Sequence, residues 1–195
     1  MKKINIIFIV LLLSLALFSQ TNFLKNVHAD SSESVVCPDV NDSHSECDYS
    51  GAVGIQNAIN AATPGSKVKI MRGTYFPTNK ISVNKSVVIE GEGRDKTVIS
   101  GSHMQAATVF VITGNSSVDV SVQDLRIEHG NAGTNGLDIR GSLVAKVYRN
   151  EFSYNGGHGI HIDTNGNASR LYIVGNVIQS NKGGGINIHS AGNAI

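Results

Sequence analysis

The sequence predicts an all-β solenoid in which short parallel strands stack coil upon coil. Three observations predict it: short β-branched segments bounded by Gly, Asn or Ser, an internal repeat towards the C-terminal end, and a composition with 21 Gly, 3 Pro and only 16% charged residues among 195. A chain of this length forms about one domain. Its formal net charge of +1 excludes both a strongly basic nucleic-acid-binding protein and an acidic disordered chain.

The N-terminal end has the pattern of an export signal. Lys2 and Lys3 precede an apolar run over residues 4–18, and a polar segment then leads to Val27-His28-Ala29. This pattern predicts a signal peptide over residues 1–29, cleaved after Ala29. The alternative, a membrane anchor, needs about 20 apolar residues, and this run is shorter.

Cleavage after Ala29 changes the sign of the net charge. It removes three lysines and no acid, which leaves 13 basic and 15 acidic residues and a net charge of −2. Nothing in this charge attracts nucleic acid or an anionic membrane. We therefore expect a secreted or cell-surface protein with no membrane span after cleavage.

The polar leader over residues 30–50 contains both cysteines, Cys37 and Cys47. In an oxidising compartment a Cys37–Cys47 disulfide is expected, and it closes a short loop. The alternative, a metal site, needs more ligands than these two thiols and His44 supply.

A short amphipathic helix precedes the strands. Ile55, Ala58, Ile59 and Ala62 recur at helical spacing, and Thr63-Pro64-Gly65 ends the pattern. The apolar face of this helix is expected to cap the solenoid. Expected strands follow within residues 68–71, 87–89, 97–99 and 108–112.

The last third of the chain contains an internal repeat. Six positions recur 26 residues later: Asn150, Phe152, Asn155, Gly159, Ile160 and Ile162 match Asn176, Ile178, Asn181, Gly185, Ile186 and Ile188. Gly136, Leu137 and Ile139 precede the same pattern by 23 residues. In such a solenoid like residues stack about 4.8 Å apart, so the paired asparagines are expected to form hydrogen-bonded ladders at turns rather than catalytic groups.

These segments resemble a known family. The segment from Gly54 to Gly93, GIQNAINAATPGSKVKIMRGTYFPTNKISVNKSVVIEGEG, resembles the opening segment of the pectate-lyase-like superfamily, and NGGHGIHI and NKGGGINI resemble its repeats. The resemblance implies a single-stranded right-handed parallel β-helix over residues 51–195, with an N-terminal cap helix. The 128 residues from Val68 onward make roughly five coils at the period of the repeat. The superfamily contains lyases, hydrolases, epimerases, adhesins and phage tailspikes, so the resemblance indicates the fold rather than the activity.

The sequence ends at Ile195 directly after a repeat, with no capping segment. An open coil exposes unpaired strand groups, so we expect residues 51–195 to be truncated at their C-terminal end. The alternative is that another chain covers this end, including end-to-end self-association.

Alternation along the strands places two polar columns on one outward face. The first column contains Asp138, His161 and Asn187, and the second contains Arg140, Asp163 and His189. Asp138, His161, Asp163 and Arg140 are the candidate catalytic residues. Asn187, His189 and His158 are the candidate substrate-binding residues, and no metal ligands are assigned.

Two reactions fit this face. Strand geometry places Asp138 and Asp163 about 8 Å apart, within the range of about 6.5 to 9.5 Å for an inverting glycosidase pair. Alternatively, the two carboxylates hold Ca²⁺ against a uronate while Arg140 or His161 removes a proton, as the resemblance to pectate lyases implies. The simpler alternative is that Asp, Arg and His only balance charge on an outward face.

His158 stands in a Gly157-His158-Gly159 motif that resembles one motif of polygalacturonase-type hydrolases. The Asn-Thr-Asp, paired Asp and Arg-Ile-Lys motifs of that group are absent from this sequence. Glycine is also expected at a turn for conformational reasons.

The function predicted from these features is binding of extracellular polysaccharide, cell-surface glycan or partner surfaces, as an adhesin-like protein or scaffold. The absence of Trp and the presence of only 5 Tyr favour binding over catalysis, because aromatic platforms assist sugar stacking. The alternative is a carbohydrate-active enzyme, either a polyuronate lyase or a glycoside hydrolase. If the protein is a lyase, Ca²⁺ is the cofactor that we expect.

Overall fold

A computed structural model describes residues 33–38, 46–105, 107–130, 133–164 and 169–189. The expected signal peptide and the last residues, 190–195, lie outside this part of the chain. The described chain is a parallel β-solenoid with one α-helix near its start, as predicted.

The strands form three sheets, all parallel, and every coil contributes one strand to each. Sheet A contains β1 (Glu33–Cys37), β2 (Tyr49–Ser50), β3 (Lys67–Ile70), β6 (Val87–Gly91), β9 (Asp119–Gln123), β12 (Val144–Tyr148) and β15 (Arg170–Val174). Sheet B contains β4 (Gly73–Tyr75), β7 (Thr97–Ser100), β10 (Arg126–Glu128), β13 (Glu151–Ser153) and β16 (Val177–Gln179). Sheet C contains β5 (Ile81–Val83), β8 (Phe110–Gly114), β11 (Leu137–Gly141), β14 (His158–Asp163) and β17 (Gly184–His189). Five strands in each of sheets B and C match the coil number expected from the repeat, and the chain makes about four complete turns.

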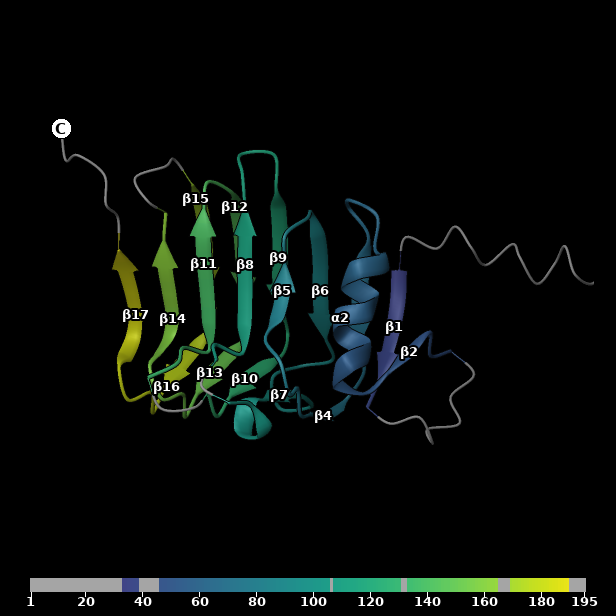
Figure 1. Ribbon diagram of the computed structural model, residues 1–195, viewed down its shortest axis with the longest axis horizontal. Helices are drawn as coiled ribbons and strands as arrows, with labels where there is room; N and C mark the ends of the chain where they lie inside the picture. Colours follow the sequence, from purple (N-terminus) through teal and green to yellow (C-terminus); the bar gives the residue numbers. More distant parts are fainter. Residues whose placement is uncertain (1–32, 39–45, 106, 131–132, 165–168, 190–195) are drawn as a thin grey trace, which may run out of the picture. The chain divides into compact units, whose positions relative to one another are not determined.

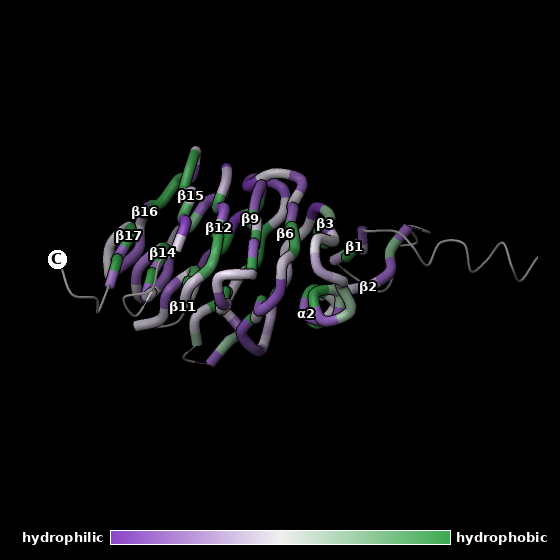
Figure 2. Tube along the Cα trace, turned by 90° about the horizontal axis from the view of Figure 1, so that it is seen from above, coloured by the Kyte–Doolittle hydropathy of each residue, from purple (hydrophilic) through white to green (hydrophobic). Residues whose placement is uncertain are grey.

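The core consists of stacked apolar side chains from all three sheets. On sheet C, Phe110, Leu137, Ile160 and Ile186 are aligned in register from β8 to β17. Figure 1 shows the sheet C strands side by side in front of sheet A, and Figure 2 shows hydrophobic and hydrophilic positions alternating along the chain. This alternation is what buries one face of each strand. In the last described coil Ile186 is 44% exposed, whereas Ile160 one coil earlier is fully buried.

The turns between sheets repeat a left-handed backbone position that the sequence pattern did not reveal. Arg149 (φ 54°) and Gly175 (φ 70°) occupy the turn from sheet A to sheet B in successive coils. Such a φ is uncommon for a residue other than Gly, Asn or Asp, so these turns depend on neighbouring hydrogen bonds. Asn150 and Asn176, which follow directly, supply them.

The predicted asparagine ladders are confirmed. Asn176 Oδ1 accepts a hydrogen bond from the backbone N–H of Asn150 at 2.9 Å, and Asn150 Nδ2 donates to the carbonyl of Val122 at 2.8 Å. At the next turn, Asn181 Oδ1 accepts from Asn155 Nδ2 at 2.9 Å. The ladders satisfy buried backbone groups that no strand pairing reaches.

The helix α2 (Gly51–Ala61) covers the first coil with the predicted face. Ile55, Ala58 and Ile59 are buried, and α2 contacts β1, β2, β3 and β5. Gly54 permits the close approach, because a Cβ there would lie 3.2 Å from the Cβ of Tyr49. Figure 1 shows α2 beside β1.

The leader contributes to the fold more than its polarity indicates. Within the predicted polar leader, β1 pairs with β3 and buries Val36 in the core. The predicted Cys37–Cys47 disulfide is confirmed, with a Cα–Cα distance of 5.8 Å. It ties the end of β1 to the residues before β2.

Candidate functional site

The members of each predicted column on sheet C lie in register on neighbouring strands, and the two columns run side by side. Asp138 pairs in register with His161, and His161 with Asn187. Arg140 pairs in the same way with Asp163, and Asp163 with His189. We call this set of six residues the sheet C cluster.

The structure corrects the prediction for Asp138. Its position in the column is as predicted, but the carboxylate is 1% exposed rather than open to solvent. Asn135 Nδ2 donates to Oδ1 at 2.8 Å, and Thr108 Oγ1 donates to Oδ2 at 3.2 Å. Arg140 Nη2 donates to Oδ2 at 2.5 Å. A buried carboxylate is stable only with such a set of donors.

Asn135 and Thr108 are the residues that sequence reasoning missed. Asn135 also accepts a hydrogen bond at 2.8 Å from the backbone N–H of His158, so it bridges two coils. Gly157 makes room for it, because a Cβ there would lie 2.5 Å from Asn135 Oδ1. One signal could have identified Asn135: it precedes Gly136 as His158 precedes Gly159, 23 residues apart in the same repeat.

His161 faces Asp138 across the strands. Its Nδ1 lies 3.5 Å from Asp138 Oδ1, and this buried nitrogen makes no hydrogen bond within the described part of the chain. In the neutral ring a proton on Nδ1 faces the carboxylate, which leaves Nε2 as the acceptor. The imidazole is half-buried, and the guanidinium of Arg140 is 55% exposed. Asp138 is therefore covered, but it holds the side chain of Arg140 and faces His161, and ligands can reach both of these side chains.

The other candidate residues surround this pair. The ring of His158 lies 6.4 Å from the ring of His161. His189 Nδ1 lies 3.8 Å from Asp163 Oδ1, where the imidazole is largely exposed and the carboxylate is half-buried. Asn187 is half-buried beside them on β17. All seven predicted residues therefore belong to three neighbouring strands of one sheet.

Two of the predicted chemistries do not fit Asp138. An inverting glycosidase needs both carboxyl groups within reach of the glycosidic bond or its attacking water, and Asp138 is covered. Ca²⁺ needs six to eight oxygen ligands, but both oxygens of Asp138 already accept hydrogen bonds. Among the described residues no group of three His, Cys, Asp or Glu side chains could hold a metal ion. The residues present do not fit a Ca²⁺ site that uses Asp138.

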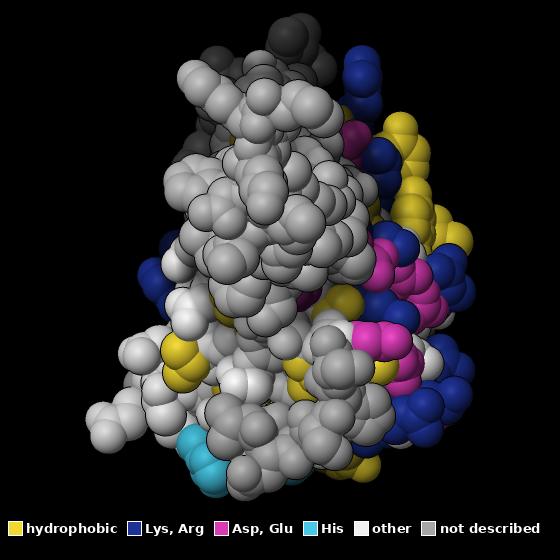
Figure 3. All heavy atoms as spheres, turned by 90° about the vertical axis from the view of Figure 1, so that its right-hand side faces the viewer, with side chains coloured by type: hydrophobic (Ala, Val, Ile, Leu, Met, Phe, Trp, Pro, Cys, Tyr) yellow, Lys and Arg dark blue, Asp and Glu magenta, His cyan; other side chains and the backbone are white. Residues whose placement is uncertain are grey.

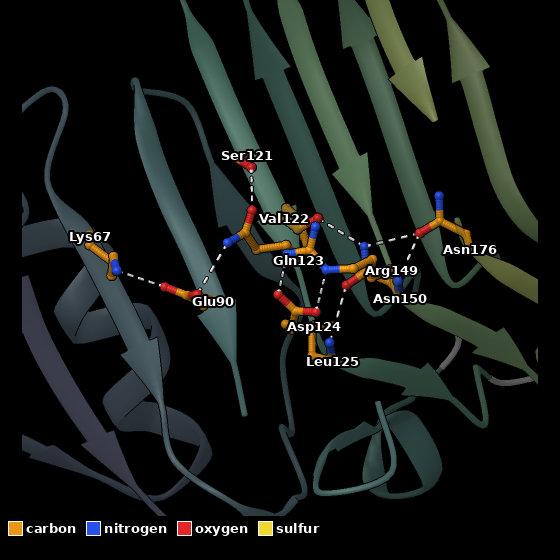
Figure 4. A network of polar contacts seen from close by, with 10 residues as sticks. All are labelled: Lys67, Glu90, Ser121, Val122, Gln123, Asp124, Leu125, Arg149, Asn150 and Asn176. Carbon is orange, nitrogen blue, oxygen red and sulfur yellow. Dashed lines mark hydrogen bonds and ion pairs between the residues drawn. The ribbon is translucent and has the colours of Figure 1, made fainter. Parts of the chain in front are cut away.

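A second polar face, on sheet A, has a different character (Figure 4). Lys67 Nζ lies 2.7 Å from Glu90 Oε2, and Gln123 Nε2 donates to Glu90 Oε1 at 3.2 Å. Further along, Arg149 binds both carboxylate oxygens of Asp124. The hydrogen bond from Lys67 lowers the pKa of Glu90, and the same contact raises the pKa of Lys67.

Acidic and basic side chains lie side by side along the right-hand edge of Figure 3. Where opposite charges pair in this way across neighbouring strands, they stabilise the sheet and leave little charge for a ligand. The sheet A face therefore has the features of a stabilising surface, and the sheet C cluster remains the candidate site.

In the part of the chain that the structure describes, no helix is long and apolar enough to span a membrane. Comparisons with protein-family models, with curated proteins and with solved structures found no match to this chain.

Proposed function

We propose that this protein is a secreted or cell-surface β-solenoid of the pectate-lyase-like superfamily that binds polysaccharide, with the sheet C cluster as its binding surface. The observation that carries the proposal is the position of Asp138, which is buried beneath the face and holds Arg140 while facing His161. A ligand then meets a guanidinium that Asp138 already holds in place, beside a partly buried imidazole. Preorganised donors lower the entropy cost of binding.

The composition of the cluster suits a hydroxyl-rich, partly acidic polymer. Arg140 donates only, whereas the amide of Asn187 and a neutral imidazole both donate and accept. The parallel strands repeat these groups at a spacing of about 4.8 Å, so a linear polymer can contact several strands at once. The same features suit an adhesin-like protein or scaffold that binds a glycan on a partner surface.

Two observations support an extracytoplasmic location. The signal-peptide pattern of residues 1–29 predicts export. The Cys37–Cys47 disulfide is compatible with an oxidising compartment.

A carbohydrate-active enzyme is the second candidate, and the distance of 3.5 Å between Asp138 and His161 favours it specifically. A carboxylate beside one imidazole nitrogen favours the tautomer whose other nitrogen is a free acceptor, which is the arrangement of a general base. In a polyuronate lyase, His161 Nε2 would take the proton alpha to the uronate carboxylate. The electron pair of that C–H bond would then form the double bond as the glycosidic C–O bond breaks. The departing oxygen would keep the electrons of that bond and take a proton from water, while Arg140 pairs with the carboxylate.

The test is retention of the full chain in native gels that contain pectin, xylan, cellulose derivatives or soluble chitin. We expect retardation by at least one polymer, and its loss in a His161→Ala/His189→Ala variant. The matched control is His129→Ala, a half-exposed histidine stacked on Tyr154 beside sheet B rather than on the sheet C face. Two results overturn the proposal: none of the polymers retards the protein, or the His161→Ala/His189→Ala variant is retarded as strongly as the wild type.

Asp163→Asn separates a binding protein from an enzyme whose reaction depends on the Asp163 carboxylate. An asparagine keeps hydrogen-bonding capacity, so a binding protein should retain its affinity. An enzyme that uses this carboxylate should lose the release of unsaturated or reducing ends, while its thermal stability stays within about 0.5 kcal/mol of the wild type.

A further inference from the structure

We infer that the protein has a second sugar-binding site, separate from the sheet C cluster, in a hollow beside the cap helix. The hollow has a volume of about 930 Å³ and lies between α2, the segment after β4 and the segment that follows η2 (Gly101–His103). It is lined by four amides and two hydroxyls: Gln56, Asn60, Asn79, Gln105, Thr78 and Ser82. We call the space that these six residues line the α2 hollow. The inference goes beyond the proposed function, because it uses none of the residues of β11, β14 or β17.

The chemistry of the lining indicates the ligand. Amides and hydroxyls donate and accept hydrogen bonds, and they match a ligand whose groups also do both. No carboxylate is among the residues that line the hollow, so metal ions and basic peptides lack a counter-charge there. A volume within about 300 to 1,000 Å³ is typical of small-molecule sites. Hydroxyl-rich sugar units fit all three properties.

Hydrogen bonds hold Gln56 and Asn60 of the α2 hollow in place. The amide of Gln56 exchanges two hydrogen bonds with the backbone of Ser82: its Oε1 accepts at 2.8 Å, and its Nε2 donates to the carbonyl at 3.1 Å. The same Nε2 donates to Asn60 Oδ1 at 2.9 Å, which orients the Asn60 amide. Since Oδ1 is engaged with Gln56, Nδ2 is the group of Asn60 that is left for a ligand. The hollow is therefore preorganised rather than created by binding.

An aromatic surface adjoins the hollow. The ring of Phe76 is 44% exposed and stacks on His103 at 4.6 Å between centroids, and His103 lines the hollow. Covering an exposed aromatic face with apolar surface gains free energy. The C–H side of a sugar ring is such a surface, while the ring hydroxyls face the amides. Together these features favour a sugar over a small polar metabolite without an apolar side.

Lys80 also lines the hollow, and its positive charge distinguishes two kinds of ligand, neutral sugar units and uronates. A neutral unit needs only the amides and hydroxyls, whereas a uronate would gain an ion pair with Lys80. The shared chemistry is the sugar hydroxyls, and the experiment separates the two cases.

The experiment is saturation-transfer NMR on the full chain with tetrasaccharides of glucose, galactose, mannose, xylose, N-acetylglucosamine and galacturonate as probes. We expect at least one of them to bind, and an Asn79→Ala/Gln105→Ala variant to weaken that binding about tenfold. Neither side chain makes a hydrogen bond that holds the fold among the described contacts, so the variant should remain folded. The matched control is Asn84→Ala, an exposed asparagine outside the hollow. Lys80→Gln, compared with the exposed Lys96→Gln, should weaken only the galacturonate probe if the ligand is acidic.

Two results overturn the inference: no tetrasaccharide binds, or the double variant binds as tightly as the Asn84→Ala control. Because the sheet C cluster is also proposed to bind sugars, the hollow variants and their controls are compared in the His161→Ala/His189→Ala background, where the outcome depends on the α2 hollow alone. Binding that is lost only in His161→Ala/His189→Ala supports the sheet C cluster and rejects the α2 hollow. Binding that is lost only in Asn79→Ala/Gln105→Ala does the reverse.

Discussion

The carboxylate of Asp138 and the imidazole of His161 occupy the same register position on neighbouring strands, with Oδ1 and Nδ1 3.5 Å apart. The carboxylate is buried and the imidazole is half-buried, so the negative charge lies directly beneath a side chain that solvent reaches. Parallel stacking produces this relationship directly, because residues at equivalent positions of successive coils lie side by side.

Asp138→Ala should destabilise the fold clearly. The substitution leaves Asn135 Nδ2 and Thr108 Oγ1 without their acceptor, and each lost hydrogen bond to a charged group costs about 1.5–3 kcal/mol. We expect the free energy of unfolding to fall by about 3 kcal/mol. Arg140 adds little to this loss, because water can replace its hydrogen bond to Asp138. Urea unfolding measures the loss. Asp163→Asn, on the next strand, is the control and should change the free energy of unfolding by no more than about 0.5 kcal/mol. Equal losses in both variants would show that burial of Asp138 is not the cause.

Asn155→Ala should weaken the second asparagine ladder. The Asn155 side chain is fully buried, where Oδ1 accepts from the backbone N–H of Gly130 at 2.9 Å. Removing it leaves that N–H unpaired, at a cost of about 1–3 kcal/mol. Asn181→Ala, one coil further, should cost less, because Asn181 is half-buried and water can replace its bonds. Chemical denaturation compares the two variants, and an equal or larger loss for Asn181→Ala contradicts the interpretation.

The Lys67–Glu90 pair predicts a small acid-dependent contribution to stability. The hydrogen bond from Lys67 holds the pKa of Glu90 below its ordinary value of 4.5. The pair therefore stabilises the fold above pH 4.5, and this contribution is lost as the pH falls through the lower pKa of the folded state. Both side chains are partly exposed, so we expect about 0–1 kcal/mol.

The measurement is thermal unfolding of the wild type and Glu90→Gln at neutral and at acid pH. The two proteins should differ at neutral pH and converge in acid. Lys67→Gln should behave in the same way over this range, since it removes the same contact. A difference that persists unchanged in acid would assign the effect of Glu90 to packing or to its hydrogen bond with Gln123.

Reduction of the Cys37–Cys47 disulfide should destabilise the N-terminal end. The two cysteines are 10 positions apart, and closing a loop of that size contributes about 2–3 kcal/mol in the chain-entropy account. Differential scanning fluorimetry with and without reductant should show a lower unfolding temperature on reduction. A Cys37→Ala/Cys47→Ala variant should unfold at the lower temperature and no longer respond to reductant. A reductant effect that persists in this variant would exclude the disulfide as its source.

The strand pattern was predictable because it depends on local periodicity. Alternation of apolar residues identifies which side of each strand is buried, and the 26-residue repeat identifies which residues stack. The two columns of the sheet C cluster follow from these facts alone, and so does the ladder of Asn150 and Asn176. The apolar face of α2 was predictable for the same reason.

The burial of Asp138 and the strands of the leader depended on contacts between residues far apart in the sequence. Alternation assigns Asp138 to the outward side, but it does not report that Thr108, 30 positions earlier, and Arg140 cover it. Val36 joins the core only because β1 pairs with β3. The α2 hollow is likewise formed where three separate segments meet. The sequence by itself determined the fold class, the repeat and the facing of each strand, because these are properties of neighbouring residues. Only the tertiary structure decided which polar groups are buried, paired or accessible, because desolvation depends on what the rest of the chain places above each side chain.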